Sequence, residues 1–508
     1  MNDVPATGVP PKEDAAGIIG IARGGGLNVL GSAFNQLLRF AITYVLARVL
    51  GISQAGLYFQ AYAILSLLGI LASFGFTQSL TRFVALYRAE EDGAAVRGVV
   101  RLALVIAAGT ATLLGAALFA GSPYIAREIF HEPRLILLLR FVSIALPSTV
   151  FADCALAATQ GFKTMRPYAR INLFFEPALN VLLTVILLTV GLGLNGAMAA
   201  LTITNVIASI LAAIALHRLV RRYRERPRYE ARRLLSFTVV SWASQLTAVG
   251  LLWADTILLG ILRTPAAVGL YQVATRLTLL MTTVIAPIGL AFAPRVADLY
   301  RRGELEALRH AYAVVTSWIF RLALPAAVVL IVFARQLLGL FGPAFESGAT
   351  VTVVLTVGQL GNAITGPCGL MLVMSGRPGI QMVGNAATLA LNLGLNLYLI
   401  PRYGVTGAAI AWAASMVFIN GLRVVAVAVT MHMLPLHEGL LKGALAGSVA
   451  AAAGLAARSF TSGPLTLLIG VPLTVVAYAL ALLLLGVGTE DRLVLASLRA
   501  RLRAGARA

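Results

Sequence analysis

The chain has 508 residues, of which 59% are hydrophobic and only 12% are charged. An ordinary soluble domain carries roughly 25% charged residues, so this composition excludes a water-soluble globular protein for most of the chain. The formal net charge is +20, but the distribution of the basic residues fits a bilayer, and no nucleic-acid partner is expected.

Apolar segments recur along the whole chain, each long enough as a helix to cross a hydrocarbon core roughly 30 Å thick. Helices are expected because lipid cannot satisfy free backbone groups. Residues 1–26 precede the first segment and are predicted to form a flexible cytoplasmic tail without a cleaved signal peptide. About fourteen spans follow, at 27–49, 57–80, 99–121, 135–159, 170–192, 196–216, 237–262, 268–292, 311–333, 349–374, 380–400, 404–428, 438–457 and 464–487.

Most Lys and Arg residues lie in the segments that are cytoplasmic when the N-terminus is inside. Eight arginines lie between Arg218 and Arg233, and five more lie between Arg492 and Arg507. Cytoplasmic loops carry an excess of basic residues, so this asymmetry predicts an even number of spans with both termini on the cytoplasmic side.

Short matches at an offset of 213 residues indicate an internal repeat. The tripeptide Gly-Leu-Tyr at 56–58 recurs at 269–271, and Leu-Tyr-Arg at 86–88 recurs at 299–301. Each copy would carry six spans, an even number, so the two copies would cross the membrane in the same sense. They should be related by a pseudo-twofold axis along the membrane normal.

The predicted fold is therefore an all-α polytopic membrane protein with two six-helix lobes and an extra C-terminal helix pair. Two similar lobes that face each other would enclose a central cavity. In chain order, the predicted parts are the tail 1–26, the N-lobe 27–216, a basic cytoplasmic linker 217–235, the C-lobe 236–428, the helix pair 438–487 and a basic cytoplasmic tail 488–508.

Three segments carry a resemblance to a known family. Residues 47–58 contain ARVLG and then GLY, residues 255–271 contain DTILLG and then GLY, and residues 392–413 read NLGLNLYLIPRYGVTGAAIAWA. Together they resemble the multidrug/oligosaccharidyl-lipid/polysaccharide exporter superfamily, and specifically its bacterial polysaccharide flippases of the Wzx type. Lipid II flippases of this superfamily usually have Arg-Asp soon after the first motif, whereas this chain has Ile-Ser-Gln at 52–54.

The resemblance implies a function in the bacterial cytoplasmic membrane. Such proteins have two lobes around a cation-lined cavity, and they flip oligosaccharides carried on polyprenyl pyrophosphate from the cytoplasmic to the outer leaflet. The implied partners are the lipid-linked oligosaccharide, membrane lipids, and the glycosyltransferases and glycan polymerase of the same pathway. Transport by alternating access is expected, without a cofactor or an enzymatic reaction.

Pyrophosphate is an anion, so its passage through an apolar slab needs a water-filled cleft with positive walls. Arginines within predicted spans would supply that charge, and at a span centre each would otherwise cost about 2.5–3.5 kcal/mol. The alternative for Arg39 is packing against another helix through side-chain hydrogen bonds. For Arg276 and Arg321 it is a structural ion pair or snorkelling, and for Arg140 it is a side chain that reaches the outer interface. The candidate substrate-binding residues are Arg39, Arg276, Arg321, Arg140, Asn35 and Gln36.

Three carboxylates also fall within predicted spans: Asp153, Glu176 and Asp255. Each could bind a coupling proton or sodium ion, or could neutralise an arginine. Glu176 precedes Pro177, which is expected to kink its helix. No metal site is expected, because Cys154 and Cys368 lie in apolar segments without metal-ligand spacing.

Two other interpretations stay open at this stage. A multidrug or lipid II exporter of the same superfamily would share the fold, although multidrug exporters usually favour carboxylates and aromatics in the cavity. A membrane glycan polymerase or ligase would belong to another class, and such enzymes usually need a large external loop. No outer loop predicted here exceeds about 15 residues.

Overall fold

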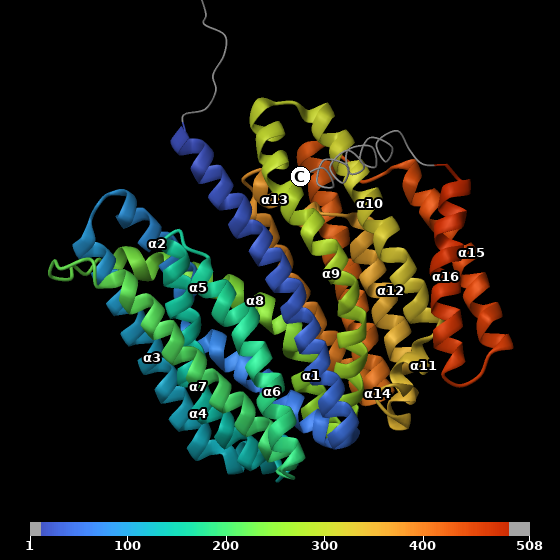
Figure 1. Cartoon of the computed structure of the whole chain (residues 1–508), viewed down its shortest axis with the longest axis horizontal. Helices are drawn as coiled ribbons and strands as arrows, with labels where there is room; N and C mark the ends of the chain where they lie inside the picture. Colours follow the sequence, from blue (N-terminus) through green and yellow to red (C-terminus); the bar gives the residue numbers. More distant parts are fainter. Residues whose placement is uncertain (1–11, 487–508) are drawn as a thin grey trace, which may run out of the picture. The chain divides into compact units, whose positions relative to one another are not determined.

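A computed structural model describes residues 12–486, and every regular element in that range is a helix (Figure 1). The prediction of an all-α protein is therefore confirmed. The helices are α1 (Lys12–Ser73), α2 (Phe76–Ala89), α3 (Gly93–Tyr124), α4 (Leu135–Gly161), α5 (Arg166–Tyr168), α6 (Glu176–Thr189), α7 (Gly193–Val220), α8 (Ala231–Leu262), α9 (Pro265–Arg302), α10 (Leu305–Val332), α11 (Ala334–Gly339), α12 (Ala349–Thr365), α13 (Cys368–Met374), α14 (Pro378–Met431), α15 (Glu438–Phe460) and α16 (Leu465–Leu484).

Ten of the described helices are long and apolar enough to cross a membrane, so the chain is a multi-pass membrane protein. Two of the ten contain a sharp bend at a glycine. Gly51 in α1 has φ 76° and Gly404 in α14 has φ 57°, a backbone region that glycine adopts without steric penalty. α14 contains two predicted spans, 380–400 and 404–428, whereas α1 contains the span 27–49 and only the first part of 57–80, which continues into α2. The total of fourteen stays a prediction.

Some boundaries differ from those expected. α1 begins at Lys12, well before residue 27, because residues 12–26 continue the same helix. The predicted span 349–374 is divided into α12 and α13 at Gly366, whose φ is 63°, next to Pro367. The predicted basic tail 488–508 lies outside the described residues.

The chain divides into two compact units. Unit 1 contains the described residues up to Ile42, Leu68–Gly121 and Leu139–Ala243, and unit 2 contains Thr43–Leu67, Ser122–Leu138 and the described residues from Ser244. Two segments of the predicted N-lobe therefore pack within unit 2. The lobe assignment rests on the repeat and stays a prediction.

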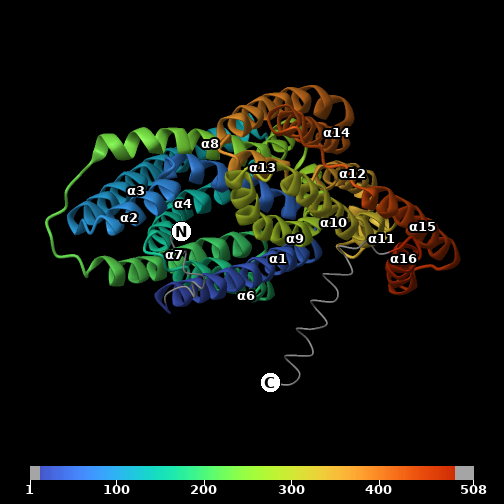
Figure 2. The ribbon, with the colours of Figure 1, turned by 90° about the horizontal axis from the view of Figure 1, so that it is seen from above.

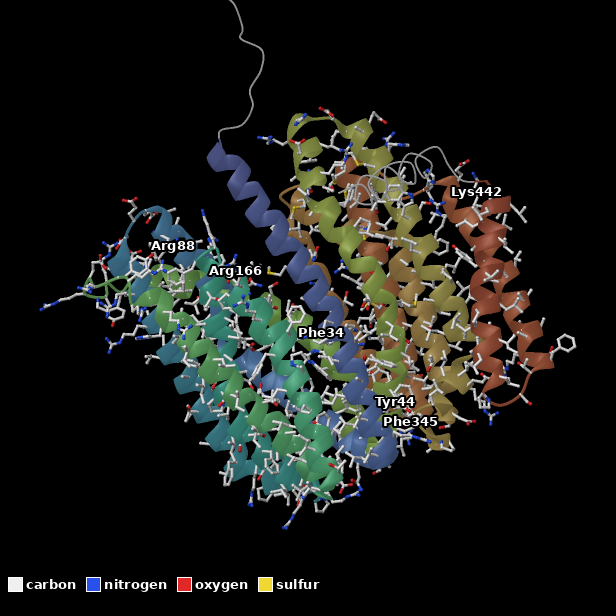
Figure 3. The ribbon with its side chains drawn as sticks, viewed as in Figure 1. Phe34, Tyr44, Arg88, Arg166, Phe345 and Lys442 are labelled. Atoms are coloured by element: carbon white, nitrogen blue, oxygen red, sulfur yellow. The ribbon has the colours of Figure 1, made fainter. Side chains whose placement is uncertain are left out.

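Aromatic side chains hold the start of the α1 segment Thr43–Leu67 within unit 2. The rings of Tyr44 and Phe341 are 5.5 Å apart, and Phe341 lies 6.3 Å from Phe345; Tyr44 and Phe345 lie close together in Figure 3. Such edge-on and tilted arrangements are favourable for aromatic pairs.

The last two helices also belong to unit 2. α15 and α16 lie side by side and pack against α10 (Figure 2). Their contact uses small residues, since Gly447 of α15 lies against Leu324 of α10 and Gly454 lies against Thr474 of α16. Helices in lipid associate largely through such close packing at small residues.

Candidate functional site

A chain of polar side chains joins α1 to the start of α6 within unit 1. Arg39 Nε donates a hydrogen bond to Asn35 Oδ1 at 2.6 Å, and Asn35 Nδ2 donates to the Asn172 carbonyl oxygen at 3.1 Å. Asn172 Nδ2 in turn donates to Glu176 Oε2 at 3.3 Å. The structure thus brings together three residues that the sequence singled out, Asn35, Arg39 and Glu176.

The backbone changes its winding at this place. Residues Ala169–Phe175, which include Asn172, form a π-helical segment, and α6 then begins with Glu176 and Pro177. Proline has no amide hydrogen to donate, and a local π-helical turn is a common way to accommodate a disturbed helix at a functional site. The predicted irregularity at Glu176-Pro177 thus lies beside the polar network.

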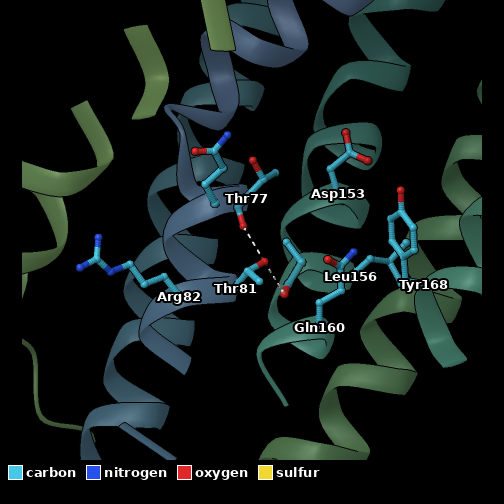
Figure 4. Close-up of a pocket in the computed structure, with 9 residues that line it drawn as sticks. Thr77, Thr81, Arg82, Asp153, Leu156, Gln160 and Tyr168 are labelled. Carbon is cyan, nitrogen blue, oxygen red and sulfur yellow. Dashed lines mark hydrogen bonds between the residues drawn. The ribbon is translucent and has the colours of Figure 1, made fainter. Parts of the chain in front are cut away.

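A cavity of about 530 Å³ lies in unit 1 between α2, α4 and the α5 region. Its described lining contains Thr77, Gln78, Thr81, Arg82, Asp153, Leu156, Ala157, Gln160 and Tyr168 (Figure 4). Asp153 is exposed to this space, and its charge interacts with those of Glu176 and Arg39. The cavity and the polar network therefore share one electrostatic environment, in which two carboxylates act on one guanidinium.

The cavity includes residues that sequence reasoning missed. Gln78, Gln160 and Tyr168 provide hydrogen-bonding groups, and Arg82 lies with its guanidinium carbon 4.4 Å from the centre of the Phe237 ring. The internal repeat could have pointed to Arg82, because Arg82 matches Arg295 at the same offset of 213 residues. Residues on three helices meet here, which local spacing alone could not indicate.

Arg88 and Arg166, at the ends of α2 and α5, lie near the same end of unit 1 (Figure 3). Arg88 is placed over the Phe162 ring, with its guanidinium carbon 5.3 Å from the ring centre.

Asp255 in α8 occupies a different environment, in unit 2. Its carboxylate accepts hydrogen bonds from Tyr271 Oη at 2.7 Å, Asn396 Nδ2 at 2.5 Å and Asn392 Nδ2 at 3.2 Å. Asp255 is only 1% exposed, and both asparagines are fully buried. These three hydrogen-bond partners are neutral, and whether Asp255 binds a coupling ion or neutralises an arginine stays a prediction.

This buried cluster joins two of the family-like segments. Asp255 and Tyr271 belong to segment 255–271, and Asn392 and Asn396 belong to segment 392–413. The asparagines lie one helical turn apart in α14 and therefore face the same side. The two family-like segments of the second predicted repeat thus contact each other at Asp255.

Arg276 and Arg321 lie on α9 and α10 of unit 2, two helices that pack against each other. Arg276 in α9 is half-buried, and its guanidinium carbon is 5.9 Å from the centre of the Trp253 ring, which in turn lies against Tyr62. Arg321 in α10 faces the last two helices: its Cγ lies against Gly443 of α15. Whether Arg276 and Arg321 act in one anion-binding site stays a prediction.

Two further predicted residues lie in unit 1. Arg140 is exposed near the start of α4, with its guanidinium carbon 5.1 Å from the centre of the Phe119 ring. Gln36 is half-buried beside Asn35. No group of three or more His, Cys, Asp or Glu residues suited to a metal ion occurs in the part of the chain that the structure describes.

Family models match both repeats of the chain. A model described as "Polysaccharide biosynthesis protein" matches residues 21–300, and one described as "MatE" matches residues 241–398. The first model alone spans more than half of the sequence.

Individual proteins are similar as well. The probable flippase AglR of Haloferax volcanii is 28% identical over 208 residues, which cover 40% of this chain and 43% of that protein. The probable low-salt glycan biosynthesis flippase Agl15 of the same organism is 26% identical over 186 residues, 36% of this chain and 39% of that protein. The matches thus span less than half the length of either relative.

The fold itself is shared with a solved structure. The lipid II flippase MurJ in its inward closed conformation superimposes with a TM-score of 0.72 at 13% identity, over 89% of this chain and 97% of that one. The likeness at this low identity concerns the arrangement of the helices.

Proposed function

The chain belongs to the polysaccharide biosynthesis protein family, and on this basis we propose that it flips polyprenyl-pyrophosphate-linked oligosaccharide from the cytoplasmic to the outer leaflet by alternating access. Its resemblance to the multidrug/oligosaccharidyl-lipid/polysaccharide exporter superfamily is confirmed by both family models and by the fold. Flippase activity is supported by the names of its relatives, AglR and Agl15. The observation that carries the proposal is the Arg39 network beside a polar cavity.

Arg39 is the proposed pyrophosphate-binding residue. A guanidinium forms paired, charge-assisted hydrogen bonds with phosphate oxygens. In the structure its charge interacts with Asp153 and Glu176. An incoming pyrophosphate would have to compete with these carboxylates, since like charges nearby repel it.

This competition supplies a coupling mechanism. Protonation of Asp153 or Glu176 removes the competing negative charge and leaves Arg39 to bind the pyrophosphate. Release of the proton restores the competition and favours release of the anion. We therefore assign the coupling ion to a proton at these two residues, with Arg39 as the group that senses it.

The cavity beside this network would receive the sugar. Its volume of about 530 Å³ lies within the roughly 300–1,000 Å³ of ligand sites. Gln78 and Gln160 offer both donors and acceptors to sugar hydroxyls, and Tyr168 offers an apolar ring with a polar end. Asn35 and Gln36 would extend this polar surface along α1.

The remaining predicted residues have secondary roles in this proposal. Arg276, held over Trp253, is the second candidate anion-binding residue, while Arg140 would interact with headgroups. Arg321 would also add positive charge, although its contact with α15 favours a packing role. Asp255 is the second coupling candidate, because amide rotation at its asparagines would turn oxygens toward a sodium ion.

The proposed setting is a bacterial cytoplasmic membrane with both termini on the cytoplasmic side. The distribution of basic residues supports this orientation. Glycosyltransferases would supply the lipid-linked oligosaccharide, and a glycan polymerase would use it after translocation.

The test uses the purified full chain in liposomes that contain a fluorescent oligosaccharide on polyprenyl pyrophosphate. Access of a membrane-impermeant quencher reports translocation. Arg39→Ala should reduce the rate at least tenfold, since a charged hydrogen bond contributes roughly 1.5–3 kcal/mol. The matched control Arg101→Ala, at an exposed position of α3, should transport at the unmodified rate.

Two results would reject this function. The first is a folded Arg39→Ala protein that transports at the unmodified rate, with folding verified by gel filtration. The second is a rate for the unmodified chain no higher than that of liposomes without protein. Gel filtration and the transport assay use the same protein preparation, so loss of folding is separated from loss of transport.

A multidrug exporter is the second candidate, and Asp153 is the observation that favours it. A carboxylate exposed to a cavity attracts organic cations, and the MatE model matches residues 241–398. Efflux of ethidium that depends on Asp153, with no movement of the lipid-linked sugar, would support this candidate over the first.

A further inference from the structure

The two arms of α14 enclose a groove that the proposed transport site does not include. The helix folds back at Gly404, and Gly384 of the first arm faces the second, since a Cβ on Gly384 would lie 3.2 Å from Ile419 Cδ1. The groove has a volume of about 760 Å³ and is lined by residues within 379–387 and 418–430. It lies wholly within unit 2.

One cation lies in this groove at a defined depth. Arg423 is the only charged side chain among the described residues that line it, and its Nη2 donates to Asn385 Oδ1 at 3.1 Å. Arg423 follows Gly404 by 19 residues, which is about 28 Å of helix. Because the hydrocarbon core is roughly 30 Å thick, a bend at one boundary places Arg423 near the other, at the level of the lipid phosphates.

Two residues that line the groove each have a buried polar atom without a hydrogen-bond partner. These atoms are Arg423 Nε and Gln381 Oε1. Both lie next to Gly369 of α13, where a Cβ would be 3.4 Å from Arg423 Nε and 3.1 Å from Gln381 Oε1. A buried polar atom without a partner is destabilising, so a ligand that supplies an acceptor to Arg423 Nε would be stabilised here. Rotation of the Gln381 amide would present a second donor.

The walls of the groove are apolar and open to their surroundings. Val383 is 65% exposed, Val425 59% and Val429 70%. Exposed aliphatic side chains on a membrane-spanning helix contact hydrocarbon chains, which gives lipid a direct path into the groove.

We propose that this groove binds one anionic bilayer phospholipid, with its phosphate on Arg423 and one acyl chain along the apolar walls. Basic pockets between membrane helices recognise lipid headgroups through charge-assisted hydrogen bonds of this kind. A single guanidinium matches the single negative charge of a phosphodiester. The greater charge of a pyrophosphate would be left partly unmatched, so the ligand is distinct from the proposed transport substrate.

Native mass spectrometry of the full chain in detergent tests this site, with phosphatidylglycerol and phosphatidylcholine of identical acyl chains as probes. The unmodified protein should bind phosphatidylglycerol about tenfold more tightly. Arg423→Gln should abolish this preference, and Arg423→Lys should restore part of it, since lysine keeps the charge. Arg402→Gln is the matched control, because Arg402 is exposed on the same helix and bonds to the Tyr398 carbonyl oxygen.

A second variant tests the acyl-chain part of the site without changing any charge. Ala387 lines the groove, so Ala387→Trp should fill it and reduce binding of phosphatidylglycerol at least several-fold. It also keeps the test available if Arg423→Gln does not fold. Equal binding of both lipids, or unchanged binding in folded Arg423→Gln or Ala387→Trp, would overturn the proposal. Displacement of phosphatidylglycerol by an equimolar polyprenyl phosphate would reassign the groove to the carrier lipid.

Discussion

Gly56 of α1 and Gly269 of α9 lie backbone to backbone within unit 2, with no room for a side chain on either. A Cβ on Gly56 would overlap the Pro265 carbonyl oxygen, and a Cβ on Gly269 would overlap that of Ile52. Ile52 and Pro265, like the two glycines, are 213 residues apart. The contact is therefore reciprocal, as in an isologous interface, and the Gly-Leu-Tyr repeats meet each other at this point.

Alanine at either glycine should destabilise the protein. The added methyl group would push two backbones apart, and overpacking of this kind costs typically 1–3 kcal/mol. Thermal unfolding in detergent should show a lower midpoint for Gly56→Ala and Gly269→Ala. Gly69→Ala is the control in the same helix, because a Cβ there meets no atom within 4 Å. Equal midpoints for Gly56→Ala and Gly69→Ala would contradict the close contact.

The hydrogen bonds of Tyr271, Asn392 and Asn396 to Asp255 should contribute cooperatively to stability. Asp255→Leu would leave the Tyr271 hydroxyl and two asparagine amides without their shared acceptor, which should cost about 1–3 kcal/mol of the free energy of unfolding. Combination with Asn396→Ala should cost less than the sum of the two changes. The control Asp298→Asn removes surface pairs with Arg301 and Arg302, worth roughly 0–1 kcal/mol. Strict additivity of Asp255→Leu and Asn396→Ala would rule out a shared network.

Stability should fall in acid as Glu230, at the end of the predicted basic linker, becomes protonated. Its carboxylate and its two hydrogen-bond partners, Tyr87 and Arg228, are called the linker clamp below. The Tyr87 hydroxyl donates to Glu230 Oε2 at 2.5 Å, and Arg228 also bonds to Glu230. These bonds, that from Tyr87 first, lower the pKa of the Glu230 carboxyl. A lowered folded-state pKa means that the stabilisation is present above the ordinary pKa near 4.5 and is lost as pH falls through the folded-state value.

Unfolding midpoints between pH 3 and pH 7 would measure this effect. The unmodified chain should exceed Glu230→Gln at neutral pH, and the difference should vanish in acid. The exposed Glu90→Gln serves as the control at the same end of unit 1. A difference between the unmodified chain and Glu230→Gln that stays constant over the whole range would show that the clamp does not titrate.

The linker clamp should also weaken in alkali, when the Tyr87 hydroxyl loses its proton. Burial and the bond to Glu230 raise the pKa of Tyr87 to about 12. A raised folded-state pKa means that this stabilisation is complete below the ordinary value of 10 and is lost as pH rises through about 12. A difference spectrum between the unmodified chain and Tyr87→Phe should therefore place this tyrosinate transition near 12. A transition at 10 would show an unclamped phenol.

Neutralisation of Glu176 should strengthen anion binding at neutral pH. Glu176→Gln removes one charge that competes for Arg39, and a charge at a few ångströms in a water-filled cleft is worth about 1 kcal/mol. Binding of the polyprenyl pyrophosphate probe at pH 7.5 should therefore tighten roughly five-fold, and its pH dependence should weaken. Arg39→Ala in the same background should remove the gain. Weaker binding in Glu176→Gln would mean that the carboxylate holds Arg39 in place rather than competing with the anion.

The sequence by itself determined the helical membrane fold, because long apolar segments have few other solutions in lipid. It also determined relationships within one helix: Arg39 bonds to Asn35 and Asn396 bonds to Asn392, both one turn apart. A fixed helical period brings such pairs together wherever the helix lies.

Only the tertiary structure decided which helices meet. Asp255 reaches Asn392 across 137 residues, and Arg321 of α10 contacts Gly443 of α15. The cavity around Asp153 likewise draws its lining from three helices. Helical spacing fixes the face on which a side chain lies, but the partner of that face depends on close packing between distant segments, which no local pattern encodes.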